Sequence, residues 1–126
     1  MLFTVAHPTF DCVTLIAVDV TDKQIIGWIK SKTTLEVDDY MLEIIQCPGA
    51  GRTASNGCFT MIRFKKWEGS NTDISILTHE AFHLAEFIFD RIRIPHHIEY
   101  TGEVYAYFIQ STVKQILDKL KKRKKQ

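Results

Sequence analysis

The chain has 126 residues, 45% of them hydrophobic and 25% charged, a composition typical of an ordinary globular protein and sufficient for one hydrophobic core. The net charge is +1, but residues 114–126 carry seven basic side chains and one acidic one, which leaves a charge of −5 on the rest. No apolar run approaches the roughly 18–20 residues of a membrane helix, and the N-terminus has no signal-peptide pattern. We therefore expect residues 1–126 to form a single cytoplasmic domain without membrane association.

The first half of the chain alternates between strand-like and helix-like segments. Residues 1–10 are apolar and β-prone, and residues 12–20 are nearly continuous in apolar and β-branched side chains, which predicts a strand covered on both faces. Residues 21–22 (Thr-Asp) offer a helix N-cap, and residues 23–32 place three isoleucines on one helical face. Residues 38–47 fit either a helix end or a strand, because periodicity does not separate the two over so short a segment.

A strong break and a turn follow. Residues 48–51 read Pro-Gly-Ala-Gly, and residues 55–57 read Ser-Asn-Gly, in which Asn-Gly is a strong hairpin signal. Two sets of side chains then alternate from Cys58 to Trp67, which predicts a strand directly before the next helix. This strand is either an edge of the sheet or a central strand, and the pattern does not decide between them.

Two long helices complete the predicted fold. Residues 71–73 (Asn-Thr-Asp) cap the first, which continues to about Arg93 before Pro95, and Thr101 caps the second. The core-facing stripe of the first helix is predicted to consist of Ile74, Leu77, Ala81, Leu84, Ala85, Ile88 and Ile92. The whole pattern predicts an α+β fold: a small twisted, mainly antiparallel sheet with an early helix, a central helix and a long C-terminal helix.

His79, Glu80 and His83 form an H-E-x-x-H motif in the central helix. Residues four apart lie on one helical face, so the imidazoles of His79 and His83 can point at a common ion. Zinc accepts imidazole nitrogens at roughly 2.0–2.1 Å, and Glu80 can act as general base on a zinc-activated water. The motif therefore predicts a zinc site on this helix.

A catalytic zinc ion needs a third protein ligand, and the best candidate is Glu103 at the start of the C-terminal helix. Residues 94–101 can span roughly 26 Å when extended, which is enough to return Glu103 to the level of His83. Two alternatives remain open. Glu86, one turn beyond His83, could be a ligand or could accept a hydrogen bond from an imidazole, and Cys58 could be a ligand.

Four residues carry a resemblance to the zinc site of gluzincin metallopeptidases: His79, Glu80, His83 and Glu103. Their spacing is similar to that of thermolysin-like members, and the size of the chain is closer to minigluzincins and to small zincin-like proteins often encoded by phages. The resemblance covers residues 74–108 and implies a zincin-like fold, bound zinc and peptide hydrolysis. Tyr107 stands where many thermolysin-like members have an aspartate that orients a zinc-bound histidine, so either another group orients His79 or the site is tuned differently.

Peptide hydrolysis also needs a donor that stabilises the oxyanion of the tetrahedral intermediate. Tyr107 lies four residues after Glu103 and therefore faces the same way on a helix, which makes it the first candidate. The alternatives are Tyr105, His96 and His97.

We therefore expect a zinc-dependent metallopeptidase that cleaves a restricted set of peptide or protein substrates, in the host cytoplasm if a phage encodes it. One alternative is a non-catalytic regulatory or interaction protein with a zincin-like fold, in which Glu86 or Cys58 closes the open position on zinc. A second is hydrolysis of the kind carried out by peptide deformylases, which predicts Cys58 on the metal. The basic tail, residues 118–126 with its cations from Lys119 to Lys125, is expected to be a frayed helix end rather than a nucleic-acid site.

Overall fold

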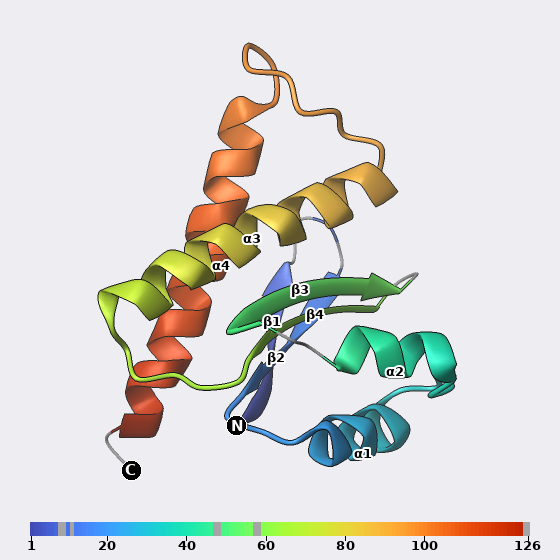
Figure 1. Cartoon of the computed structure of the whole chain (residues 1–126). Coiled ribbons are helices and arrows are strands. Elements are labelled where there is room, and N and C mark those ends of the chain that lie inside the picture. Colours follow the sequence, from blue (N-terminus) through green and yellow to red (C-terminus); the bar gives the residue numbers. More distant parts are fainter. Residues whose placement is uncertain (8–9, 11, 47–48, 57–58, 125–126) are drawn as a thin grey trace.

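A four-stranded mixed sheet forms the middle layer of the protein (Figure 1). The structure is a computed structural model that describes residues 1–7, 10, 12–46, 49–56 and 59–124. Its strands, in the spatial order β1-β2-β4-β3, are β1 (Leu2–His7), β2 (Cys12–Val18), β3 (Gly51–Asn56) and β4 (Phe59–Phe64). The outer strands β1 and β3 pair antiparallel with β2 and β4, whereas the central pair β2 and β4 is parallel.

Helices cover both faces of this sheet. On one face lie α1 (Asp22–Lys32) and α2 (Asp39–Ile45), and on the other lie α3 (Asn71–Arg91) and α4 (Gly102–Lys124), which cross each other (Figure 1). Alternate residues of β2 enter two separate apolar clusters, because successive side chains of a strand point to opposite faces. Ile16 and Val18 pack with α3 and α4, whereas Leu15 and Ala17 pack with α1 and α2. The α+β fold class is confirmed.

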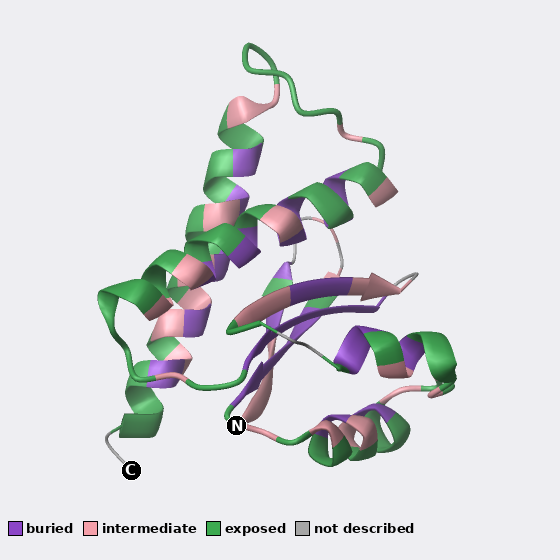
Figure 2. Ribbon diagram, in the orientation of Figure 1, coloured by how far each residue is buried: buried purple, intermediate pink, exposed green. Residues whose placement is uncertain are grey.

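The elements of the first half form where their sequence patterns predict. Both faces of β2 are buried in the sheet interior (Figure 2). Helix α1 starts with a capping box in which the Thr21 hydroxyl accepts a hydrogen bond from the backbone of Gln24, and the Gln24 side chain accepts one from the backbone of Thr21. The ambiguous segment after residue 38 is helix α2, because the carboxylate of Asp38 caps it by accepting a hydrogen bond from the N–H of Met41.

The strand at the sheet edge beside α3 is β3, which the sequence pattern does not predict. Its residues lie between the Pro-Gly break and the Asn-Gly signal, and they show no apolar alternation. Strand β4 pairs with both β2 and β3, so the central-strand interpretation of Cys58 to Trp67 is confirmed and the edge interpretation is wrong. Gly57 and Cys58, which join the two strands, lie outside the described residues.

Helix α3 is rotated slightly from the predicted orientation. Its N-cap is Ser70, whose hydroxyl accepts a hydrogen bond from the N–H of Asp73. Ile74 and Ile92 of the predicted stripe are each 38% exposed. Glu80 and Phe89 are buried instead, because α3 packs against two neighbours, β3 on one side and α4 on the other.

The basic end of α4 is ordered through Lys124. Lys119 Nζ lies 2.5 Å from the carbonyl oxygen of Thr4, and Lys124 Nζ lies 3.1 Å from that of Glu68. Arg123 forms a further ion pair at 2.9 Å with an aspartate that follows β2. Helix α4 thus includes most of the basic tail, and these contacts join the tail to the body of the protein. None of the described helices is both long and apolar enough to cross a bilayer.

A chain of buried polar groups links β1, β2 and β4. The Nε2 atom of His7 lies 2.9 Å from Thr14 Oγ1, which lies 2.9 Å from Thr60 Oγ1. The imidazole also stacks on the ring of Phe108 from α4 at a centroid distance of 4.6 Å. Burial lowers the pKa of His7 to about 4, so this imidazole is neutral in the folded protein at neutral pH.

The protein should lose stability on acidification between pH 6.5 and pH 4. In this range the unfolded chain, in which His7 has its ordinary pKa of 6.5, binds a proton that the folded protein does not. The loss attributable to His7 is about 3 kcal/mol. A His7→Gln variant lacks this titration, so urea denaturation should show the free-energy difference between wild type and variant shrinking by that amount from pH 7 to pH 4. A difference that is constant with pH would contradict the assignment.

Candidate metal centre

The imidazoles of His79 and His83 converge on the outer face of α3. Their Nε2 atoms lie 3.0 Å apart, and the ring centroids lie 4.7 Å apart with the ring planes at 78°. Two nitrogens bound to one tetrahedral zinc ion at roughly 2.0–2.1 Å would be about 3.3 Å apart, so small ring rotations admit an ion. The pair predicted from the H-E-x-x-H spacing is therefore assembled by the helix itself.

Glu86 orients one of these two imidazoles. Its Oε1 atom lies 3.0 Å from Nδ1 of His83, three residues earlier on the same helix. When Nδ1 carries the proton and donates it to this carboxylate, Nε2 has the lone pair that a metal requires. Of the roles left open for Glu86, the structure supports hydrogen bonding to a histidine. No described residue makes the equivalent contact with Nδ1 of His79.

Glu80 points away from the histidines' outer face and towards the sheet. It is 7% exposed, and the hydroxyl of Thr53 on β3 lies 2.5 Å from its Oε2 atom and 2.9 Å from its carbonyl oxygen. A carboxylate in such a buried place needs a donor, because an unsatisfied charge there is costly. Thr53 is the partner that the sequence pattern misses, since nothing in residues 51–56 indicates a strand.

Gly51 allows β3 to approach α3 closely enough for this contact. A Cβ atom at position 51 would lie only 2.5 Å from Cγ2 of Ile76 and 3.5 Å from Cγ of Glu80. Any larger residue would therefore push the strand away from the helix. Gly51, the last residue of the Pro-Gly-Ala-Gly break, thus allows the edge strand to lie beside Glu80.

Glu103 does not join the two histidines in this structure. No three His, Cys, Asp or Glu side chains of the described part of the chain are grouped closely enough to hold one ion. Glu103 is exposed in the first turn of α4, and it precedes Tyr105, which is buried, by two residues, or about 200° around the helix. Cys58, the other candidate ligand, lies outside the described residues.

The four candidates for oxyanion donor lie in different surroundings in the structure. Tyr107 is 66% exposed on the outer side of α4, and the ring of His97 packs on Tyr100 in the connector. The rings of Tyr105 and His96 lie 4.5 Å apart. Both line a hollow of about 410 Å³ that Glu86 also lines, so these two candidates lie near the carboxylate that contacts His83.

No family model, no curated protein and no solved structure matches the chain. Its function must therefore be inferred from the side chains themselves.

Replacing Thr53 should destabilise the protein through Glu80. In Thr53→Val the shape is kept but the hydroxyl is lost, so the buried carboxylate has no donor, and the free energy of unfolding should fall by about 1–3 kcal/mol. Thr53→Ser keeps the hydroxyl and should stay within about 1 kcal/mol of wild type. Urea denaturation at pH 7 measures both. Equal losses in the two variants would show that the hydroxyl contact is unimportant.

Proposed function

We propose that this protein is a zinc-dependent peptidase in which His79 and His83 hold the ion and Glu80 is the general base. The observation that carries the proposal is the 3.0 Å approach of the two Nε2 atoms, with a carboxylate on Nδ1 of His83. Histidines that serve only as core residues would be buried among their partners. The side chain of His83 is instead 45% exposed, which leaves the shared side of the pair accessible.

The chemistry follows from the positions of the chain's own groups. When bound, zinc polarises the scissile carbonyl and lowers the pKa of its water towards 7. Glu80 accepts the proton of the attacking water and delivers it to the leaving amine. Thr53 holds Oε2 of Glu80 on the β3 side of the helix, so the proposed transfer would use the other carboxylate oxygen, Oε1. Glu103 remains the proposed third ligand. Tyr107 remains the first proposed oxyanion donor, and Tyr105 and His96, which line the hollow beside Glu86, are the alternatives that the packing favours.

The free edge of β3 supports a peptide as the substrate. This strand is the last of the sheet, and its only partner among the described strands is β4. The unpaired backbone groups of an edge strand can add an extended peptide by ordinary strand pairing. Because Thr53 of this strand contacts Glu80, a peptide bound there would pass the proposed base. Such pairing also supports a restricted set of extended substrates.

A non-catalytic zinc-binding protein is the second candidate, and one observation favours it. The described residues supply two converging histidines but no third ligand beside them. Two imidazoles alone hold zinc weakly, so the ion could instead link this protein to a partner that completes the coordination. Hydrolysis of the deformylase kind depends on Cys58 and is separated from both by the metal-binding experiment below.

Zinc should bind with one ion per chain and should depend on both histidines. His79→Ala or His83→Ala should abolish binding measured by competition with a chromophoric chelator, and Glu86→Gln should weaken it about 10–100-fold. His97→Ala is the matched control and should bind as wild type does. Glu103→Gln and Cys58→Ser then identify the third ligand, since only the true ligand lowers the affinity. Undiminished binding in His79→Ala would rule out the site.

Peptide hydrolysis by the zinc-loaded protein should depend on Glu80. Glu80→Gln preserves shape and zinc binding but removes the base, so the rate should fall about 100- to 10,000-fold on a quenched fluorescent peptide library. A chelator should abolish the wild-type activity and added zinc should restore it. Zinc-loaded wild type that cleaves no member of the library, while binding zinc normally, would favour the non-catalytic candidate.

A further inference from the structure

Two carboxylates continue the line of the two histidines along α3. His79, His83, Glu86 and Asp90 are spaced four, three and four residues apart, so they form one line on the same helical face. Glu86 and Asp90 then line the hollow of about 410 Å³ between the C-terminal half of α3, residues 94–96 and the start of α4. We call this feature the acidic hollow. Its centre lies about 8 Å beyond His83 along the helix axis.

The carboxylates of the acidic hollow have one contact with a basic group in the described structure, that of Glu86 Oε1 with Nδ1 of His83 at 3.0 Å. Among the described residues, no lysine or arginine forms an ion pair with Glu86 or Asp90. Asp90 lies in the last turn of α3, where the partial negative charge of the helix end disfavours further negative charge. A cationic ligand would relieve this repulsion.

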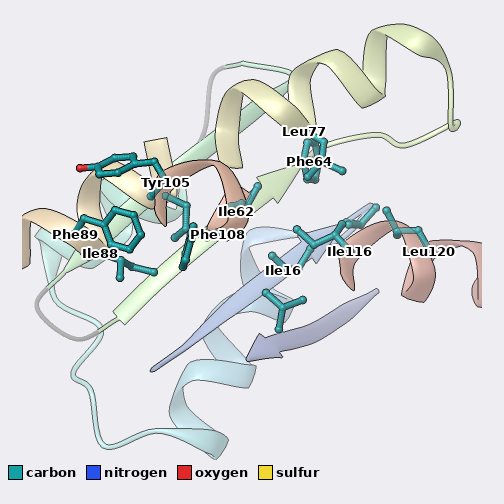
Figure 3. Close-up of a cluster of buried hydrophobic side chains, with 14 residues drawn as sticks. Ile16, Ile62, Phe64, Leu77, Ile88, Phe89, Tyr105, Phe108, Ile116 and Leu120 are labelled. Atoms are coloured by element: carbon teal, nitrogen blue, oxygen red, sulfur yellow. The ribbon is translucent and has the colours of Figure 1, made fainter. Parts of the chain in front are cut away.

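The Tyr105 side chain supplies a polar group aimed into the same place. Its ring is only 6% exposed and packs on Phe89 at a centroid distance of 4.4 Å. Its hydroxyl points away from the core cluster (Figure 3), and no described residue forms a hydrogen bond with it. Burial raises the pKa of Tyr105, and the charges of Glu86 and Asp90, which line the same hollow, raise it further. The hydroxyl therefore stays protonated.

Aromatic side chains form the rest of the wall. Phe82 and Phe87 are each 41% exposed and line the acidic hollow on the α3 side, and the His96 ring packs against Tyr105 on the other. Exposed aromatic faces beside two carboxylates suit a delocalised planar cation, which can stack on a ring and donate several hydrogen bonds at its edge. A compact ammonium ion satisfies only part of this arrangement.

We propose that the acidic hollow binds the guanidinium group of an arginine side chain from a peptide. Glu86, Asp90 and the hydroxyl of Tyr105 accept its hydrogen bonds. The offset of about 8 Å from His83 corresponds to about two residues of an extended chain. In the proposed peptidase, arginine would thus be selected about two residues from the bond that is cleaved. Only this last statement rests on the proposed function.

Binding can be tested without zinc. The metal-free protein is titrated with a blocked arginine amide and with the citrulline amide, which has the same shape but no charge, and amide shifts are followed by NMR. Arginine should shift residues 86–96 and 105 and should bind at least tenfold more tightly than citrulline, as expected for charge-assisted hydrogen bonds. Equal binding of the two overturns the proposal. A blocked lysine amide that binds as well as arginine overturns the assignment to a guanidinium.

Asp90→Asn is the decisive variant because Asp90 is exposed and takes no part in the proposed metal site. It should weaken arginine binding about tenfold, and Tyr105→Phe should weaken it severalfold. Asp118→Asn makes the same charge change on α4, in a surface pair with Lys114, and should have no effect. Unchanged arginine affinity in Asp90→Asn overturns the proposal.

A hydrolysis assay separates this proposal from the proposed function. Two peptides that differ only by arginine or citrulline are offered to the zinc-loaded protein, and the preference in kcat/KM for arginine should disappear in Asp90→Asn. Arginine binding by a protein that binds no zinc supports the acidic hollow and defeats the metallopeptidase. Hydrolysis without preference for arginine at any position supports the metallopeptidase and defeats the role of the acidic hollow in substrate selection.

Discussion

The contact between α3 and the edge strand β3 determines how the helix that carries His79, Glu80 and His83 is oriented. Gly51 lets the strand approach Ile76, and the hydroxyl of Thr53 reaches the carboxylate of Glu80. These contacts fix the rotation of α3 about its own axis. With Glu80 turned towards the strand and the apolar stripe turned towards the sheet, His79 and His83 are left on the outer side. A shift of the strand would therefore disturb Glu80 and the histidine pair together.

Three sides of helix α3 carry different kinds of side chain. One side packs into the core shown in Figure 3, with Leu77 and Ile88 fully buried. A second side carries Glu80 to β3. The third carries the line of His79, His83, Glu86 and Asp90, whose mutual spacing is set by the helix alone. Features that depend on this single rigid element are well defined, whereas the position of Glu103 depends on the connector and on how α4 packs.

Charge is distributed unevenly between the two ends of α3. Near its start, the basic end of α4 contacts the body through Lys124 and Arg123, which bond the carbonyl of Glu68 and the carboxylate of Asp19. Near its end, Glu86 and Asp90 have no lysine or arginine partner in the described structure. The cations of the tail therefore serve packing at one end and leave the negative charge at the other end available to a ligand.

The local sequence pattern was sufficient to predict the features that depend on a single helix or a single strand. The period of α3, the capping of α1 and the strand character of β2 follow from neighbouring residues, and so does the convergence of His79 and His83. Tertiary packing alone decided the rest. Strand β3 exists because β4 and α3 bury it, although its own residues have little strand pattern, and Thr53 becomes the partner of Glu80 only then. The position of Glu103 relative to the histidines was likewise decided by the packing of α4. The helical period predicts the face of the helix on which a residue lies, but it does not predict where the next helix packs.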